Sequence, residues 1–294
     1  MTDIATLNDM QAARRARLRL LSTSVRYVLL FAVGLVMLYP LIWLVGASFK
    51  TNSEIFSGAG FIPENPTLDG YIRGWETSTP YTFGRFFWNS FLIILPKVIG
   101  TAISCTMAAY AFARFDFPLK KILFGSVIAI LLLPNVVTRI PQYILFRDLG
   151  WLDSFLPLWV PSAFAGDAFF VFMLVQFLRS LPSDMDEAAR VDGANSLQTL
   201  VYIVVPMLAP ALISVCLFQF MWTMNDFLGP LIYLSSVDKY PVSLALKLSI
   251  DTTEAFEWNR ILAMSVLTIA PALIVFFAAQ RYFIEGISSG GVKG

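Results

Sequence analysis

The sequence predicts an all-α integral membrane protein with six transmembrane helices and both termini in the cytoplasm. Hydrophobic residues make up 57% of the 294 residues and charged residues only 14%, which is too little charge to cover the surface of a soluble domain. The mean hydropathy is +0.70, and charge-free stretches recur at the length of a bilayer span. The net charge of +1 gives no reason to expect a nucleic-acid partner.

Six stretches approach the roughly 20 mostly apolar residues that a transmembrane helix needs. They are, in chain order, 27–49, 86–113, 122–138, 154–178, a segment within 193–225, and 261–280. The first is too long for the apolar part of a signal peptide, so we expect it to be retained. The third is short, and the PQYILF that follows can lengthen it. Lys97 interrupts the second span and Asp167 the fourth. An even number of spans places both termini on one side.

The basic residues indicate which side that is. More than half of the 21 Lys and Arg lie in the N-terminal tail, the loops after the second and fourth spans, and the C-terminal tail. By the positive-inside rule these segments face the cytoplasm. We therefore expect a basic cytoplasmic tail over 1–26 and a six-span domain over 27–294.

The sequence offers no support for a metal site or for enzymatic catalysis. Histidine is absent, which removes the commonest metal ligand and general base. Cys105 and Cys216 lie in apolar runs and are expected to be small buried residues. Without a nucleophile–base pair or a metal set, the chain is not expected to be an enzyme. A self-sufficient secondary transporter for a small polar solute stays as the alternative; it would need midplane carboxylates and internal repeats, and only Asp167 fits.

The segment SDMDEAARVDGA, residues 183–194, is unusually acidic for its apolar surroundings. Ser183 or Asp184 can cap a helix there, with Asp186 or Glu187 completing a capping box. Gly193 offers the left-handed stop. We expect a short helix on the cytoplasmic face, which is either a solvated loop or a knob whose outward alanines fit the cleft of another protein.

The segment resembles the EAA loop of permease subunits of binding-protein-dependent ABC importers. That motif has E-A-A, three residues, G, nine residues, then I-x-L-P. The chain has Glu187-Ala188-Ala189, Gly193 and Ile203-Val204-Val205-Pro206, so every position matches except Val205, which stands where the motif has leucine. Four further stretches are similar to carbohydrate-importer permeases, in particular to the smaller maltose permease subunit: 89–117, 170–194, 220–234 and 280–294.

The resemblance implies a type I ABC importer permease fold in the bacterial inner membrane that moves a carbohydrate inward by alternating access. It implies that this permease is coupled to a separate cytoplasmic ATPase dimer. The residues that would carry this coupling are Glu187, Ala188, Ala189, Gly193 and Pro206. It also implies a second homologous permease and an extracytoplasmic substrate-binding protein, docked by the outer segments 50–85 and 237–260. ATP and Mg²⁺ would be bound by the ATPase, because this chain has no G-x-x-x-x-G-K-[ST] loop and is expected to hold no cofactor. The terminal GISSGGVKG is expected to be a flexible tail near the ATPase.

Candidate pathway residues are the ionisable and amide side chains within or beside the spans: Lys97, Arg139, Asp167, Asn225 and Asp226. Lys97 and Arg139 suit an anionic sugar such as a uronate oligosaccharide. Lys97 can equally reach the interface or pair with Asp167. Asn225 and Asp226 can bind sugar hydroxyls or cap helix ends. We expect the helix to break at Gly229-Pro230, and irregular backbone at membrane depth belongs beside a cavity.

Overall fold

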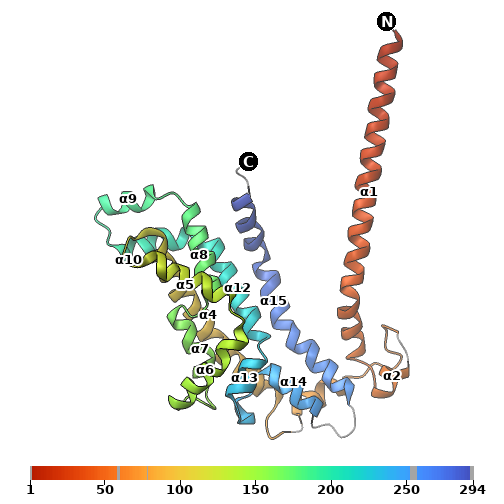
Figure 1. The fold of residues 1–294 in the computed structure, drawn as a ribbon. Coiled ribbons are helices and arrows are strands. Elements are labelled where there is room, and N and C mark those ends of the chain that lie inside the picture. Colours follow the sequence, from red (N-terminus) through yellow and green to blue (C-terminus); the bar gives the residue numbers. More distant parts are fainter. Residues whose placement is uncertain (1, 58–59, 78, 252–256, 292–294) are drawn as a thin grey trace. The chain divides into compact units, whose positions relative to one another are not determined.

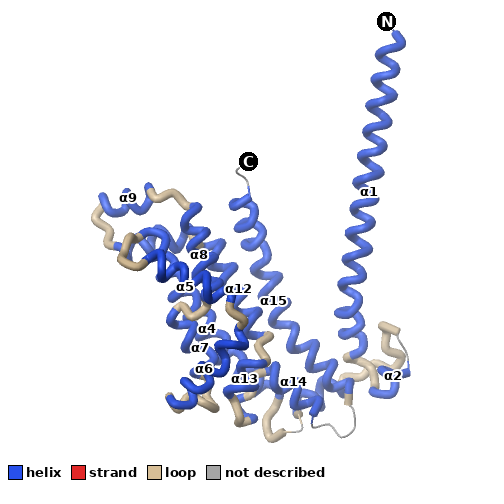
Figure 2. The backbone as a smooth tube through the Cα atoms, viewed as in Figure 1, coloured by secondary structure: helices blue, strands red, loops and turns tan. Residues whose placement is uncertain are grey.

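The computed structural model describes residues 2–57, 60–77, 79–251 and 257–291, and every regular element of these residues is a helix (Figures 1 and 2). The chain divides into two compact units. One comprises residues 1–71 with 257–266, and the other 72–256 with 267–294.

The first unit is built on α1 (Thr2–Ala47), with α2 (Asn52–Ser57), the start of α3 (Asp69–Glu76) and the start of α15 (Trp258–Gly291). The backbone of α1 is helical through residue 26, where a tail was expected to meet the first span. Most apolar side chains of α1 between residues 20 and 42 are exposed, Leu30 by 62% and Val36 by 70%. Such a surface requires lipid or another protein around it. Lys50, just beyond α1, is buried and donates to the Gly60 carbonyl at 2.7 Å.

The second unit is organised around α4 (Phe83–Arg114), against which α8 (Ala168–Ser180) and α12 (Ala209–Met224) both pack. Phe170 and Leu174 of α8 and Val215 of α12 are fully buried there with Cys105 of α4. Cys105 is a free, buried thiol and Cys216 a free, partly buried one. Both cysteines therefore pack as small residues, as the sequence predicts.

Three of the expected spans are broken helices. α5 (Lys120–Leu132) and α6 (Asn135–Asp148) meet at 108° beside Pro134. α7 (Leu156–Trp159), the 3₁₀ helix η1 (Val160–Phe164) and α8 make up a second candidate span, interrupted at Ala165, which has a φ of +53°. α10 (Ser196–Thr199), the π-helical η2 (Leu200–Val204) and α11 (Val205–Met207) meet α12 at 80°.

Among the described residues, four helices are long and apolar enough to span a membrane, and six spans result if each bent pair counts as one. The helices cover Arg19–Ala47, Phe83–Arg114, Leu156–Ser180 and Trp258–Gln280. The six expected stretches are thus all found. The third is longer than the charge-free stretch because α6 extends it through Arg139, and it is bent.

Two local expectations were wrong. The break after α12 falls at Asn225–Phe227, and Gly229 and Pro230 lie inside the first turn of α13 (Leu228–Tyr233), where proline is tolerated. The chain then forms the 3₁₀ helix η3 (Val237–Lys239) and α14 (Val242–Asp251). The expected glycine-rich tail is helical through Gly291, as the end of α15, and residues 292–294 lie outside the described part.

Asp153 clips two loops of the second unit together. Its carboxylate accepts from the amides of Ser235 at 3.0 Å and Ser236 at 2.9 Å and pairs with Lys239 Nζ at 2.8 Å. Burial raises the pKa of this carboxyl, but the hydrogen bonds from Lys239, Ser236 and Ser235 outweigh it and hold the pKa well below its ordinary value. The folded state therefore favours the ionised form.

We expect Asp153→Asn to lower the free energy of unfolding by about 1–2 kcal/mol at neutral pH, because the ion pair with Lys239 is lost. The effect is no larger because both side chains are partly exposed, and solvent weakens their attraction. Asparagine also tolerates the φ of +55° at this position. Since the folded pKa is lowered, the stabilisation is complete above the unfolded pKa of about 4 and is lost as the pH falls through the folded value. Thermal unfolding of the purified protein should show a Tm difference that is constant from about pH 7 to 5 and shrinks below about pH 4. Equal Tm values at pH 7 would contradict the clip.

Candidate functional site

The acidic segment forms α9 (Asp184–Val191), as the sequence predicts, but its first turn is not capped as expected. Ser183 has a φ of −78° and a ψ of −17° and makes no side-chain cap hydrogen bond. The capping box lies instead at α10, where Asn195 Oδ1 accepts from the Gln198 amide and Gln198 Oε1 from the Asn195 amide, each at 2.9 Å. The acidic first turn of α9 is favoured by the helix dipole rather than by a box.

Gly193 ends α9 in the left-handed conformation, with a φ of +85°. Its amide donates to the Arg190 carbonyl at 3.1 Å, and the Ala194 amide donates to the Ala189 carbonyl at 2.9 Å. This pair of bonds is the Schellman motif, which satisfies carbonyls that the end of a helix leaves open. The stop predicted at Gly193 is confirmed.

The two faces of α9 differ in burial. Asp186 and Ala189 point inward and are 6% and 4% exposed, whereas Glu187 and Ala188 are exposed. The expectation that both alanines face outward was therefore wrong for Ala189, because the i, i+3 spacing puts it on the face of Asp186. Pro206, the last motif residue, lies in α11 just before the 80° bend into α12.

A cavity of about 420 Å³ brings together all four charged residues singled out within or beside the spans. Lys97 of α4, Arg139 of α6, Asp167 at the start of α8 and Asp226 after α12 all line it. Polar side chains complete the wall: Thr138, Gln142, Ser162 and Tyr233. Ser162 is held from α4, because its carbonyl accepts from Ser104 Oγ at 2.6 Å.

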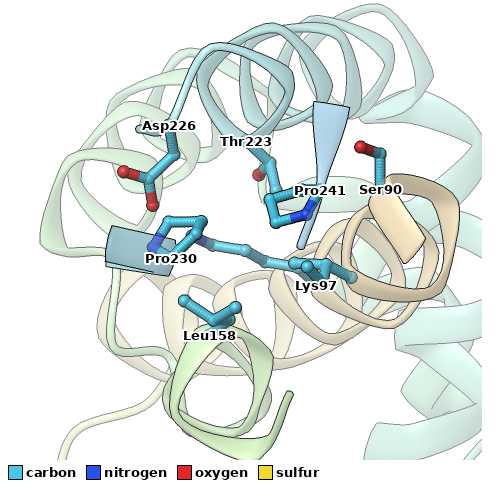
Figure 3. A pocket seen from close by; sticks show the side chains of 8 residues that line it. Ser90, Lys97, Leu158, Thr223, Asp226, Pro230 and Pro241 are labelled. Carbon is cyan, nitrogen blue, oxygen red and sulfur yellow. The ribbon is translucent and has the colours of Figure 1, made fainter. Parts of the chain in front are cut away.

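The Lys97 side chain reaches into a small adjoining space between Leu158 and Pro230, with Asp226 beside Pro230 (Figure 3). The expected alternative, an ion pair of Lys97 with Asp167, does not form between these two described residues; Asp167 accepts instead from Thr101 Oγ1 at 3.4 Å. Asp226 Oδ1 accepts from the Gly229 amide at 3.0 Å. A Cβ at Gly229 would collide with the Asp226 carboxylate, so glycine permits this arrangement.

Asn225 does not line the cavity. Its side chain is exposed and Nδ2 donates to the Met221 carbonyl at 2.8 Å, so it caps the end of α12. Trp222, one turn earlier, packs against Phe169 and Phe170 of α8, with ring centroids 5.3 and 5.0 Å away. Of the two roles expected for these residues, sugar binding or helix capping, Asn225 shows only capping. Asp226 accepts from an amide in the first turn of α13 and also lines the cavity.

The breaks in three helices border this one cavity. Leu133 lies at the bend between α5 and α6, Gly166 and Asp167 lie between η1 and α8, and Asp226 lies between α12 and α13; all four line the wall. Backbone that leaves helical geometry at membrane depth is tolerated where it lines a polar cavity or is buried in protein. Broken helices also border the binding sites of many membrane transporters.

The comparisons with known proteins agree with this architecture. The family described as binding-protein-dependent transport system inner membrane component matches residues 100–289. The chain belongs to this family. The permease is therefore a multi-pass inner-membrane subunit of an ABC importer, a system that also includes an ATPase and a substrate-binding protein.

Individual relatives cover most of the permease. It is 32% identical to a probable ABC transporter permease of Pyrococcus horikoshii, over 90% of this chain and 95% of the relative. It is 31% identical to the arabinooligosaccharides transport system permease of Halalkalibacterium halodurans, over 89% and 93%. In structure it resembles a chain of a bacterial ABC transporter involved in the import of the acidic polysaccharide alginate, with a TM-score of 0.78, 25% identity, and 88% and 95% of the two chains covered.

Sequence reasoning missed several residues of the permease that the fold brings to these sites. From the sequence, Arg114 is only one of the basic residues that follow the second span, yet it forms an ion pair with Asp186 of α9. Thr138, Gln142 and Tyr233 were not singled out, although they line the cavity with Arg139. One signal was present: in α6 the polar residues Thr138, Arg139 and Gln142 recur at helical spacing within an apolar stretch.

Proposed function

We propose that this permease is one half of a heterodimeric membrane unit that moves an oligosaccharide into the cytoplasm by alternating access. The exposed Glu187-Ala188 face of α9 carries the proposal, because a small side chain allows close approach and a carboxylate can pair with a basic residue in a groove of the ATPase. The matching relatives named for sugar uptake support a carbohydrate as the substrate. We place α9 and both chain termini on the cytoplasmic side, following the basic residues.

In this proposal the energy comes from outside the chain. ATP and Mg²⁺ are bound by a separate ATPase dimer, and the permease itself has no ATPase site and no cofactor. Its sequence lacks the glycine-rich phosphate loop that such a site uses. The substrate-binding protein docks on the outer segments 50–85 and 237–260.

We further propose that the cavity residues Lys97, Arg139, Asp167 and Asp226 form this subunit's part of the translocation pathway. The two carboxylates suit sugar hydroxyls, and the two cations suit an acidic sugar. The similarity to a transporter involved in alginate import supports the acidic class. Asn225 is left out of this set because its amide is engaged in capping α12.

The test is to purify the permease from its native membrane, identify the proteins that accompany it, and assay ATPase activity with the sugar-loaded binding protein. An ATPase and a second permease should be recovered with the wild type. Glu187→Lys should reduce the recovered ATPase roughly tenfold or more, because reversing a charge at a closely packed interface replaces attraction with repulsion.

Asp148→Lys provides the matched control. It makes the same charge change at an exposed carboxylate, 61% accessible, on α6, which carries no part of the proposed ATPase contact. Recovery of the ATPase should be unchanged. If instead the wild type purifies alone and sugar uptake follows an ion gradient regardless of ATP, the permease is a secondary transporter and the proposal is overturned.

A further inference from the structure

The junction between α8 and α9 depends on one guanidinium group. α8 ends at Ser180, and three non-helical residues, 181–183, lead to α9. Arg114, the last residue of α4, donates through Nη2 to the carbonyls of Leu181 at 3.1 Å and Pro182 at 3.3 Å. Its Nε lies 2.6 Å from Oδ2 of Asp186. One side chain of α4 thus contacts both the linker and the inward face of α9.

The ion pair is buried: the Arg114 side chain is 12% exposed and that of Asp186 8%. Tyr110, one turn earlier on α4, is 4% exposed and packs edge-on against Phe115 at 5.2 Å, which closes the apolar side of the site. Exposed ion pairs contribute little, but removing one partner of a buried pair leaves an uncompensated charge. The planar fork of arginine also suits several acceptors at once, which a lysine cannot reproduce.

The geometry assigns the two acidic residues of α9 to different tasks. Glu187 is exposed, whereas Asp186 is turned inward onto Arg114. From Arg114, α4 runs back to Lys97, which lines the cavity about 25 Å of helix away. A displacement of α9 can therefore reach the cavity wall along one continuous rigid element, provided that the linker does not absorb it.

We propose that the Arg114–Asp186 pair is a latch that makes α9 and α4 move as one body. When the ATPase displaces the exposed face of α9, α4 moves with it and displaces the part of the cavity wall that α4 forms. Arg114 and Asp186 are positioning residues in this scheme, and neither touches the ATPase or the sugar. The inference rests on the proposed function, because it needs an ATPase that acts on α9.

The test uses the full transporter in liposomes, with its ATPase, second permease and binding protein, and measures sugar transported per ATP hydrolysed. Asp186→Asn keeps the shape of the side chain and removes its charge, so the complex should assemble while the transport ratio falls roughly tenfold. Arg114→Lys should give an intermediate ratio because it keeps the charge and loses the fork. Arg114→Met should lower the ratio at least as much as Asp186→Asn, because it also removes the bonds to the Leu181 and Pro182 carbonyls. The double variant Arg114→Met/Asp186→Asn should be no worse than Arg114→Met alone, because Arg114→Met already removes the contact with Asp186.

Asp116→Asn is the matched control, because it breaks the exposed pair of Asp116 with Lys120 just beyond the same end of α4. Its transport ratio should equal that of the wild type. The latch is overturned if Asp186→Asn keeps the wild-type ratio, if the two single effects add, or if the only effect is loss of assembly. These outcomes differ from failure of the proposed function, in which the wild type itself shows no ATP-dependent sugar uptake.

Discussion

Gly193→Pro should lower ATP-driven transport by more than about tenfold while leaving the membrane-embedded helices folded. Proline fixes φ near −65°, whereas Gly193 has a φ of +85°, and proline has no amide to donate to the Arg190 carbonyl. The two effects together cost about 3 kcal/mol or more, enough to unfold the end of α9 and misplace Glu187. Sugar-stimulated ATPase activity and uptake in liposomes should both fall by more than about tenfold. Gly193→Ala should have a smaller effect, because a left-handed alanine costs about 1–2 kcal/mol.

Gly150 offers a closely matched control. It ends α6 with a φ of +68°, its amide donates to the Arg147 carbonyl at 3.0 Å, and the Trp151 amide donates to the Phe146 carbonyl at 2.8 Å. Gly150→Pro therefore breaks the same Schellman motif at a helix that carries no part of the proposed ATPase contact. Binding of the ATPase to the purified variant should match the wild type. Equal loss of ATPase binding in Gly150→Pro and Gly193→Pro would show general misfolding and contradict the role of α9.

Lys97→Gln should lower the uptake of an acidic oligosaccharide roughly 10- to 100-fold, because a hydrogen bond to a charged group contributes about 1.5–3 kcal/mol in a site shielded from water. Lys97 lines the polar cavity, and Asp167 accepts a hydrogen bond from Thr101 instead of pairing with Lys97, so the charge of Lys97 is available to a ligand. The glutamine keeps much of the length of the lysine side chain and removes its charge. Uptake at several sugar concentrations would separate weaker binding from slower turnover.

A neutral oligosaccharide of the same length is the control substrate for Lys97→Gln. Its uptake should change less than about threefold, because sugar hydroxyls do not depend on a cation. Arg139→Gln should repeat the pattern, since Arg139 lines the same wall. Equal losses for the acidic and the neutral sugar would mean that Lys97 supports the cavity and does not recognise an anion.

Local features were the most predictable. The stop of α9 at Gly193 requires only that one residue adopt a left-handed backbone, and glycine does so without steric cost. The capping box was misplaced because Ser183 and Asn195 both satisfy the residue preference, and only the backbone direction after Pro182 decides between them. The burial of Ala189 likewise depends on where α9 meets the rest of the unit, which its own residues do not specify.

The sequence alone determined that this is an all-helical membrane protein of several spans with a short acidic helix ending at Gly193, because span length, apolar content and backbone preference are properties of neighbouring residues. Only the tertiary structure decided which distant charges meet: Arg114 with Asp186, Asp153 with Lys239, and Lys97 with Arg139 and Asp226 around one cavity. These encounters depend on how α4, α8 and α12 pack and where their neighbours break. Such packing follows from contacts between residues far apart in the chain, and no local pattern records it.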